Sequence, residues 1–265
     1  MTVVIKIGGQ AQESAADRRN VARQIAALSR AGHRVVVVHG GGKALTETLG
    51  RLGIKTEFHE GLRVTNAATR DVALMVLAGI VNKQWVAEIQ QHEQAALGIC
   101  GGDAHLVEAK KVVVRSKNRR KDLGFVGRPH RVRTDVLEMA LRAGWVPVVA
   151  SLALNGTQEY YNVNADDLAA AIASAVKADR LFYLTDSGGV WDANQQLLGT
   201  VKRTEIPGLI RKGVVRDGMI PKLRSCARTL SHGVSEIDIL SPAVPNALLK
   251  ALAGGRGTGT RVVDQ

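Results

Sequence analysis

The sequence is poor in aromatic residues, cysteine and proline. Of its 265 residues, 3% are aromatic, two are cysteines and six are prolines. Because the hydrophobic share is nevertheless 45%, the core must be built from Ala, Val, Leu and Ile. Cys100 and Cys226 stand apart, without a CxxC pair or a nearby histidine cluster. This argues against a zinc site and a disulfide framework, and we expect two reduced thiols.

Long apolar runs are absent as well. No uninterrupted run reaches the ~18 residues of a membrane span, and Lys6 and Gly8 interrupt the first apolar run, where a signal peptide would stay apolar. We therefore expect a cytoplasmic protein with no membrane partner. The length suffices for one large α/β domain or for two lobes of about 100 to 150 residues.

Acidic residues are outnumbered, and the imbalance is local. Lys and Arg total 36 against 24 Asp and Glu, and residues 110–133 hold ten of the basic residues but one acid, Asp122. Nucleic-acid binding would use such a surface. However, the most basic part, residues 115–121, has no aromatic residue for stacking on bases. We interpret the segment as a solvated hairpin of short strands that attracts anionic substrates, rather than as a nucleic-acid site.

Glycine, by contrast, is abundant and is placed after strand-like runs. Val35–Val38 are four β-branched residues, typical of a strand buried on both faces, and His39 and Gly40–Gly42 follow. Helical spacing resumes at Ala44, so the turn would direct backbone N–H groups toward an anion. An ordinary tight turn is the alternative, but three successive glycines exceed its needs. Neither the P-loop nor the dinucleotide fingerprint fits this spacing.

A similar run opens the chain, with a charged residue inside it. Val3–Ile7 reads as a buried strand that ends in Gly8-Gly9, and Lys6 lies within it. Burying an ammonium group is costly unless it meets an anion or a carboxylate. A lysine that reaches out to solvent is the alternative. Because a glycine turn follows two residues later, we favour a functional lysine.

Polar side chains gather at two further strand ends. Asn162 and Asn164 point to one side of a strand, and Asp166 follows in the first turn of an alanine-rich helix. Helix capping alone would explain one amide and one acid, but two amides and two acids lie within six residues. The second place is the loop 186–192, which follows a buried strand at the carboxyl end, where ligands bind in open α/β sheets.

Strand and helix patterns alternate along the chain. A short hairpin is expected over residues 56–65, with Arg63 at its turn, where it could bind a carboxylate. The fold class predicted is α/β, with an open, mainly parallel central sheet and helices on both faces. Helices are expected over residues 17–31, 44–52, 66–91 with a bend at Gly79, 134–143, 165–176, 205–212, 221–231 and 246–253.

Five motifs occur in the order in which the amino acid kinase family has them, and the chain resembles that family over nearly its whole length. They are Lys6-Ile7-Gly8-Gly9, His39-Gly40-Gly41-Gly42, Gly61-Leu62-Arg63-Val64-Thr65, Asn162-Val163-Asn164-Ala165-Asp166 and Asp217-Gly218-Met219-Ile220-Pro221-Lys222. The resemblance implies two lobes. Residues 1–175 would bind the acceptor and form a dimer, and residues 176–265 would bind ATP.

The resemblance also implies a reaction. ATP, with Mg²⁺ held mainly by its phosphates, would phosphorylate the γ-carboxylate of N-acetyl-L-glutamate in arginine biosynthesis. Such a transfer needs positioning and positive charge, and the acceptor carboxylate is already ionised, so no general base is needed. By the same resemblance Lys6 and Lys222 neutralise the moving phosphoryl group, and Asp166 holds both lysines.

The remaining site residues are likewise implied by the resemblance. Gly9, Gly41 and Gly42 would offer backbone N–H groups, and Arg63 and Asn162 would bind the acceptor. The nucleotide pocket would be lined by Asp186, Ser187, Gly188, Gly189, Val190, Trp191, Val214, Val215 and Arg216.

The sequence departs from the family in three places and leaves two alternatives open. One departure is the basic segment 115–121, which is unusually charged for the family. Family members that arginine inhibits carry an extra helix before the first strand, so we expect a homodimer insensitive to arginine. The run Gly101–His105 lacks the usual lysine and further glycines, which leaves that loop undefined. The alternatives are a kinase for carrier-linked aminoadipate in lysine biosynthesis and a non-catalytic amino-acid-sensing protein. Lys6 and Lys222 argue against the second, since a sensor needs neither.

Overall fold

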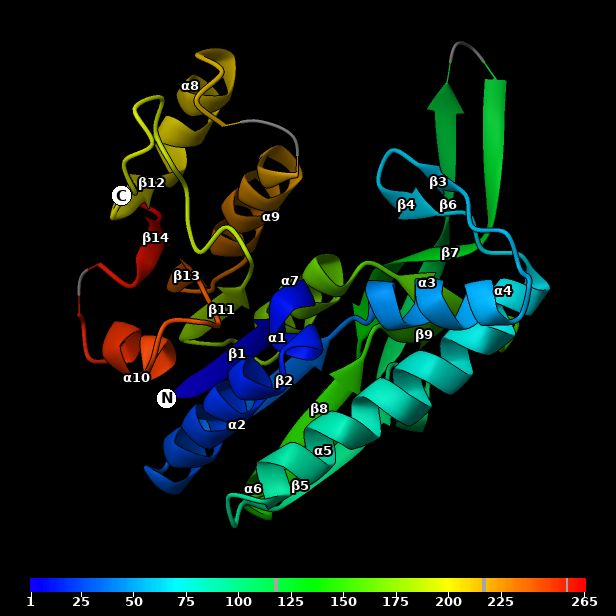
Figure 1. Ribbon diagram of the computed structural model, residues 1–265, viewed down its shortest axis with the longest axis horizontal. Coiled ribbons are helices and arrows are strands. Elements are labelled where there is room, and N and C mark those ends of the chain that lie inside the picture. Colours follow the sequence, from blue (N-terminus) through cyan, green and yellow to red (C-terminus); the bar gives the residue numbers. More distant parts are fainter. Residues whose placement is uncertain (117–118, 216–217, 256) are drawn as a thin grey trace.

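The computed structural model describes the chain from Met1 to Gln265 apart from residues 117–118, 216–217 and 256 (Figure 1). Its centre is an eight-stranded sheet in the order β12-β14-β13-β11-β1-β2-β8-β5. All neighbouring pairs are parallel except β13 and β14. The strands are β1 Thr2–Ile7, β2 Arg34–His39, β5 Ala96–Cys100, β8 Val146–Ala150, β11 Arg180–Leu184, β12 Thr200–Lys202, β13 Glu236–Leu240 and β14 Gly259–Val263. The predicted α/β class with a mainly parallel sheet is confirmed.

Helices cover both faces of this sheet, which explains why its strands lack a polar alternation. In β1, Val3 and Ile5 pack on one face and Val4 on the other, and all three are fully buried. The first face carries α2 (Ala15–Arg30), α5 (Asn82–Gln90) and α10 (Ala247–Leu252), and the second carries α6 (Asp135–Arg142), α7 (Ala165–Ala175) and α9 (Met219–Ser231). Further helices are α1 (Gly9–Glu13), α3 (Gly42–Arg51), η2 (Asp103–His105), η3 (Arg203–Glu205) and α8 (Ile206–Arg211).

One long helix runs beside the sheet without a break. It consists of α4 (Ala67–Ala73), a π-helical segment η1 (Leu74–Val81) and α5. The long helix was predicted, but the bend expected at Gly79 is replaced by the π-helical segment. By length and hydropathy alone it could span a membrane. Yet Trp85 and Ile89 are buried against the sheet, so it serves as a core helix.

The basic segment is built differently from the expectation. Instead of short strands, β6 (Val107–Ser116) and β7 (Arg119–Val132) form a long antiparallel hairpin. With β9 (Leu152–Leu154) and β10 (Tyr160–Val163) they close a small barrel that the sequence did not predict. Register shifts between Glu108 and Ala109 and between Lys111 and Val113 interrupt the alternation that would have indicated long strands. Figure 1 shows part of β6 and β7 extending away from the body of the molecule.

The short hairpin after α3 is present as predicted. It consists of β3 (Phe58–His59) and β4 (Leu62–Arg63). Arg63 lies in the second strand, opposite Phe58, rather than at the turn that was expected. Strand pairing therefore fixes the backbone from which its side chain extends. The boundary predicted between two lobes at residue 175 stays a prediction, and the eight-stranded sheet runs through both parts.

Candidate active site

Two lysines that are distant in sequence meet at one carboxylate. Lys6 Nζ lies 2.9 Å from Asp166 Oδ1, and Lys222 Nζ lies 2.5 Å from Asp166 Oδ2. The three side chains come from the end of β1 and from the first turns of α7 and α9. Burial alone would raise the pKa of Asp166, but the charges of Lys6 and Lys222 outweigh it and hold this pKa well below its usual range. Asp166 therefore stays ionised between two ammonium groups.

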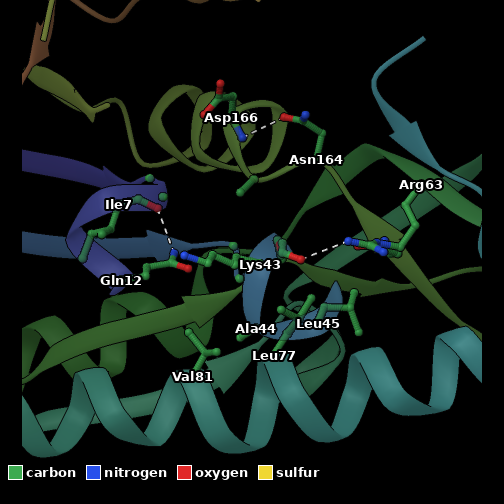
Figure 2. A pocket seen from close by; sticks show the side chains of 18 of the residues that line it. Ile7, Gln12, Lys43, Ala44, Leu45, Arg63, Leu77, Val81, Asn164 and Asp166 are labelled. Atoms are coloured by element: carbon green, nitrogen blue, oxygen red, sulfur yellow. Dashed lines mark hydrogen bonds between the residues drawn. The ribbon is translucent and has the colours of Figure 1, made fainter. Parts of the chain in front are cut away.

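The start of α7 is fixed by a cap. Asn164 Oδ1 accepts hydrogen bonds from the backbone N–H of Asp166, at 2.8 Å, and of Asp167, at 3.1 Å. Asn164 is thus the N-cap of α7. Because the cap fixes the first helical turn, it also sets where the Asp166 carboxylate lies (Figure 2).

Glycines allow the chain to pass close to this cluster. A Cβ on Gly8 would lie 2.5 Å from the carbonyl oxygen of Leu184 and 3.4 Å from Lys6 Nζ. A Cβ on Gly9 would lie 3.4 Å from Asp186 Oδ2. The first contact leaves no room for a side chain, since a carbonyl oxygen in a sheet cannot move aside. The glycine turn after β1 therefore passes beside Lys6 at Gly8 and beside Asp186 at Gly9.

A pocket of about 640 Å³ opens beside the cluster. It is lined by all eight residues predicted for catalysis and acceptor binding except Lys222: Lys6, Gly9, Gly41, Gly42, Arg63, Asn162 and Asp166. Gly41 is the N-cap of α3, and a Cβ there would lie 2.6 Å from Leu77 Cδ2. The glycine loop of residues 40–42 thus lies between β2 and the long helix, with its backbone at the pocket.

Arg63 brings a buried positive charge to the same pocket. Its side chain donates to Thr46 Oγ1 at 2.7 Å and to the carbonyl oxygen of Gly42 at 3.0 Å, and it stacks on Phe58 at 4.6 Å. Burial lowers the pKa of Arg63, although a guanidinium stays protonated. In the part of the chain that the structure describes, Arg63 has no acidic partner within ion-pair distance. The arrangement suits an incoming carboxylate.

Comparison with known proteins identifies the family of this arrangement. The sequence profile of the amino acid kinase family matches residues 1–241. The chain belongs to the amino acid kinase family. This confirms the resemblance carried by the five motifs. Acetylglutamate kinase of Koribacter versatilis (strain Ellin345) is 45% identical, with 99% of each chain covered.

Two further relatives also match this chain over nearly its whole length. Acetylglutamate kinase of Methylobacterium nodulans is 43% identical, with 98% of this chain and 88% of that protein covered. The crystal structure of smu.665 from Streptococcus mutans UA159 superimposes with a TM-score of 0.82 at 28% identity and covers 100% of this chain and 99% of the other. The fold of this amino acid kinase is thus shared from end to end with a solved structure.

The residues predicted to bind nucleotide lie outside this pocket. The loop 186–191 follows β11, where Gly188 has φ +64° and Trp191 is 46% exposed with its Nε1 donating to the carbonyl oxygen of Ser187. Val190 and Val215 are buried, and the N–H and C=O of Val190 are already paired, with Thr260 Oγ1 and with the N–H of Leu198. Arg216 lies outside the described residues. Among the predicted nucleotide-binding residues that the structure describes, Asp186 lies next to Gly9. The described set is Asp186, Ser187, Gly188, Gly189, Val190, Trp191, Val214 and Val215.

Sequence reasoning missed one wall of the pocket of this amino acid kinase. Leu77, Val81 and Trp85 line it from the long helix, four residues apart, and Arg18 lines it from α2. Figure 2 shows Leu77 and Val81 on this side of the pocket. Arg18 donates to the carbonyl oxygen of Gln12 at 2.9 Å and pairs with Glu88 at 3.2 Å. The helical spacing of the three apolar residues was visible, but it could not indicate that this stripe faces a pocket rather than the core.

Proposed function

We propose that this chain is an acetylglutamate kinase, which transfers the γ-phosphoryl group of ATP to the γ-carboxylate of N-acetyl-L-glutamate, giving N-acetylglutamyl 5-phosphate and ADP. The observation that carries the proposal is the Lys6–Asp166–Lys222 cluster beside a pocket that also holds Arg63. Relatives at 43–45% identity over nearly the whole chain bear that name. The product would serve arginine biosynthesis.

Phosphoryl transfer needs little from the protein beyond positive charge and correct positioning of the substrates. A phosphoryl group in transfer spreads negative charge over its equatorial oxygens, and the acceptor carboxylate is already ionised near pH 7. Lys6 and Lys222 would neutralise this charge. Asp166 would keep both ammonium groups aimed at the same place, because each of its oxygens already binds one of them.

The acceptor would be held by its other carboxylate and by its amide. Arg63 is buried, lines the pocket and has its guanidinium beside the glycine loop, so it would bind the α-carboxylate. Asn162, on β10, would bind a polar group of the acceptor. Gly9, Gly41 and Gly42 would offer backbone N–H groups to the γ-carboxylate and to the phosphoryl group.

ATP would bind along the loop 186–191 and the segment at Val214 and Val215, with Asp186 at the meeting point of the two substrates. Among the described residues, no group of three or more His, Cys, Asp and Glu side chains could hold a metal ion. Both oxygens of Asp166 are already engaged by lysines. Mg²⁺ therefore fits as a ligand of the ATP phosphates rather than of a protein cage, and it would supply further positive charge there.

An ATP-dependent hydroxamate assay tests the proposal. Hydroxylamine traps an acyl phosphate, so the purified protein with ATP and Mg²⁺ should give product with N-acetyl-L-glutamate and far less with aminoadipate-type acceptors. Preference for the second kind of acceptor would instead favour the carrier-linked kinase of lysine biosynthesis. Product with neither acceptor would favour a non-catalytic sensing role.

We predict that Arg63→Ala raises the KM for N-acetyl-L-glutamate by about 10- to 100-fold and changes kcat much less, because it removes charged hydrogen bonds to the bound acceptor. Steady-state kinetics with each substrate varied in turn measures this. Arg70→Ala is a matched control, since Arg70 also stacks on an aromatic ring, that of Phe125 at 4.3 Å, away from the pocket. A change confined to the KM for ATP would contradict the assignment of Arg63.

We also propose a homodimer and a cytoplasmic location. Met75 and Ile80 are 65% and 54% exposed, and residues five apart are neighbours on a π-helical segment, so they form an apolar spot on the long helix. A second copy of the chain would cover this spot. Light scattering in solution can measure whether the protein is a dimer. Cys100 and Cys226 are free and buried, which suits a reducing compartment.

A further inference from the structure

A histidine that the proposed reaction does not use lies directly beneath the glycine loop. His39 ends β2 and is fully buried. Its Nδ1 lies 2.7 Å from the carbonyl oxygen of Gly40, and its Nε2 lies 3.1 Å from Asn82 Nδ2. Asn82, the first residue of α5, is also fully buried. The two side chains thus form a polar link between the glycine loop and the long helix.

The carbonyl oxygens around His39 and Asn82 decide which ring nitrogen of His39 carries the proton. Asn82 Nδ2 lies 2.8 Å from the carbonyl oxygen of Val148 and 3.3 Å from that of Ile99. Carbonyl oxygens only accept hydrogen bonds, so this atom is the amide nitrogen and donates. His39 Nδ1 likewise faces a carbonyl oxygen, that of Gly40, so Nδ1–H donates to it, and in the neutral ring Nε2 is left to accept from Asn82. Burial lowers the pKa of His39 to about 4, which keeps the ring neutral near pH 7.

This hydrogen bond sets the direction of the peptide between Gly40 and Gly41. In a planar trans peptide the C=O and the N–H point in opposite directions. With the Gly40 carbonyl held toward the His39 ring, the N–H of Gly41 points away from it. In the described part of the chain this N–H donates to no protein acceptor, and Gly41 lines the pocket. An unpartnered N–H is thus held ready for an anionic ligand.

The long helix restrains the same loop from a second side. A Cβ on Gly41 would lie 2.6 Å from Leu77 Cδ2 and 3.2 Å from Val81 Cγ2, so the loop is packed against these side chains without a gap. Asn82 follows Val81 directly. One helix therefore supports the loop through apolar contacts at Gly41 and through the amide that fixes the His39 ring.

We propose that His39, held by Asn82 as its Nδ1–H tautomer, is a positioning residue that keeps the Gly41 N–H directed into the pocket, where it stabilises the phosphoryl group or the carboxylate it joins. The proposal rests on the proposed kinase function. Removal of one preorganised donor from an anionic transition state typically costs ~10²- to 10³-fold in kcat. Loss of its orientation alone should cost less.

Two variants at one position separate orientation from packing. His39→Leu keeps the size of the side chain but removes the donor, whereas His39→Asn keeps an amide nitrogen close to the position of Nδ1. We expect His39→Leu to lower kcat by about tenfold or more, with the KM for ATP within about twofold, and His39→Asn to recover most of kcat. His130→Leu, at an exposed position in β7, is the control and should leave kcat unchanged.

A readout that is independent of activity comes from ¹⁵N NMR of the histidine rings in the wild-type protein. We expect His39 to be neutral at pH 7 with the proton on Nδ1. A proton on Nε2, an imidazolium, or normal kcat in His39→Leu would each overturn the inference. If His39→Leu does not fold, the tautomer and His39→Asn decide. If the wild-type protein phosphorylates no acceptor, the proposed function fails, while the tautomer still tests the geometry.

Discussion

Replacement of either Lys6 or Lys222 by methionine should lower kcat by on the order of a hundredfold or more while the fold stays intact. Each substitution removes one positive charge from the place where negative charge accumulates during transfer. Methionine keeps an unbranched apolar stem, so packing changes little. For Lys222 this matters because its Nζ lies over the ring of Tyr183, 4.9 Å from the centroid. The hydroxamate assay under saturating substrates measures kcat directly.

A lysine–aspartate pair outside the pocket provides the control. Lys111 Nζ lies 2.7 Å from Asp122 Oδ2, a distance like those at Asp166, but the two side chains are 40% and 64% exposed. Lys111→Met should therefore leave kcat within about twofold, since exposed ion pairs contribute little. Near-normal turnover in Lys6→Met or in Lys222→Met would remove that lysine from the mechanism.

The central sheet could be predicted because its strands are buried on both faces. Uninterrupted runs such as Val35–Val38 fit few other structures, and the glycines after them mark the turns. The barrel could not be predicted in this way. Bulges in β6 shift the alternation along the strand, and the partners β9 and β10 are only three and four residues long. The π-helical segment likewise leaves no mark in the apolar pattern.

The candidate site was predictable in part from single residues. A lysine inside a buried strand needs a counter-ion, and an excess of amides and acids at a helix start needs an explanation beyond capping. Nothing local, however, shows that Lys6 and Lys222 share Asp166, because their meeting depends on the packing of α7 and α9 on the sheet. That pairing was implied by the family resemblance. The link between His39 and Asn82 joins residues 43 positions apart and needed the structure.

Loss of the Asp166 carboxylate should lower kcat as much as loss of either lysine does. Asp166→Asn replaces an anion by an amide, whose nitrogen would face one of the two ammonium groups. Lys6 and Lys222 would then repel one another without a charge between them. We expect kcat to fall by about a hundredfold or more, and the free energy of unfolding at pH 7 to fall by about 3 to 5 kcal/mol, the range for breaking a buried ion pair.

Acidification gives this prediction a second readout. The folded-state pKa of Asp166 is lowered, so its contribution to stability is fully present above the unfolded-state pKa, near 4, and is lost as the pH falls toward the folded-state value. The difference in unfolding free energy between wild type and Asp166→Asn, from urea titrations, should therefore shrink from pH 7 to about pH 3. A difference that grows on acidification would contradict the ion-pair account.

Asp167→Asn is the matched control for this prediction, because Asp167 occupies the same helical turn but burial raises its pKa instead. It should leave kcat unchanged. The double variant Asp166→Asn/Lys222→Met should be less unstable than the sum of the two single changes, since the second substitution removes the repulsion that the first creates. Strictly additive losses would mean that Lys6 and Lys222 do not interact through Asp166, and the cluster would then be three separate residues rather than one charge arrangement.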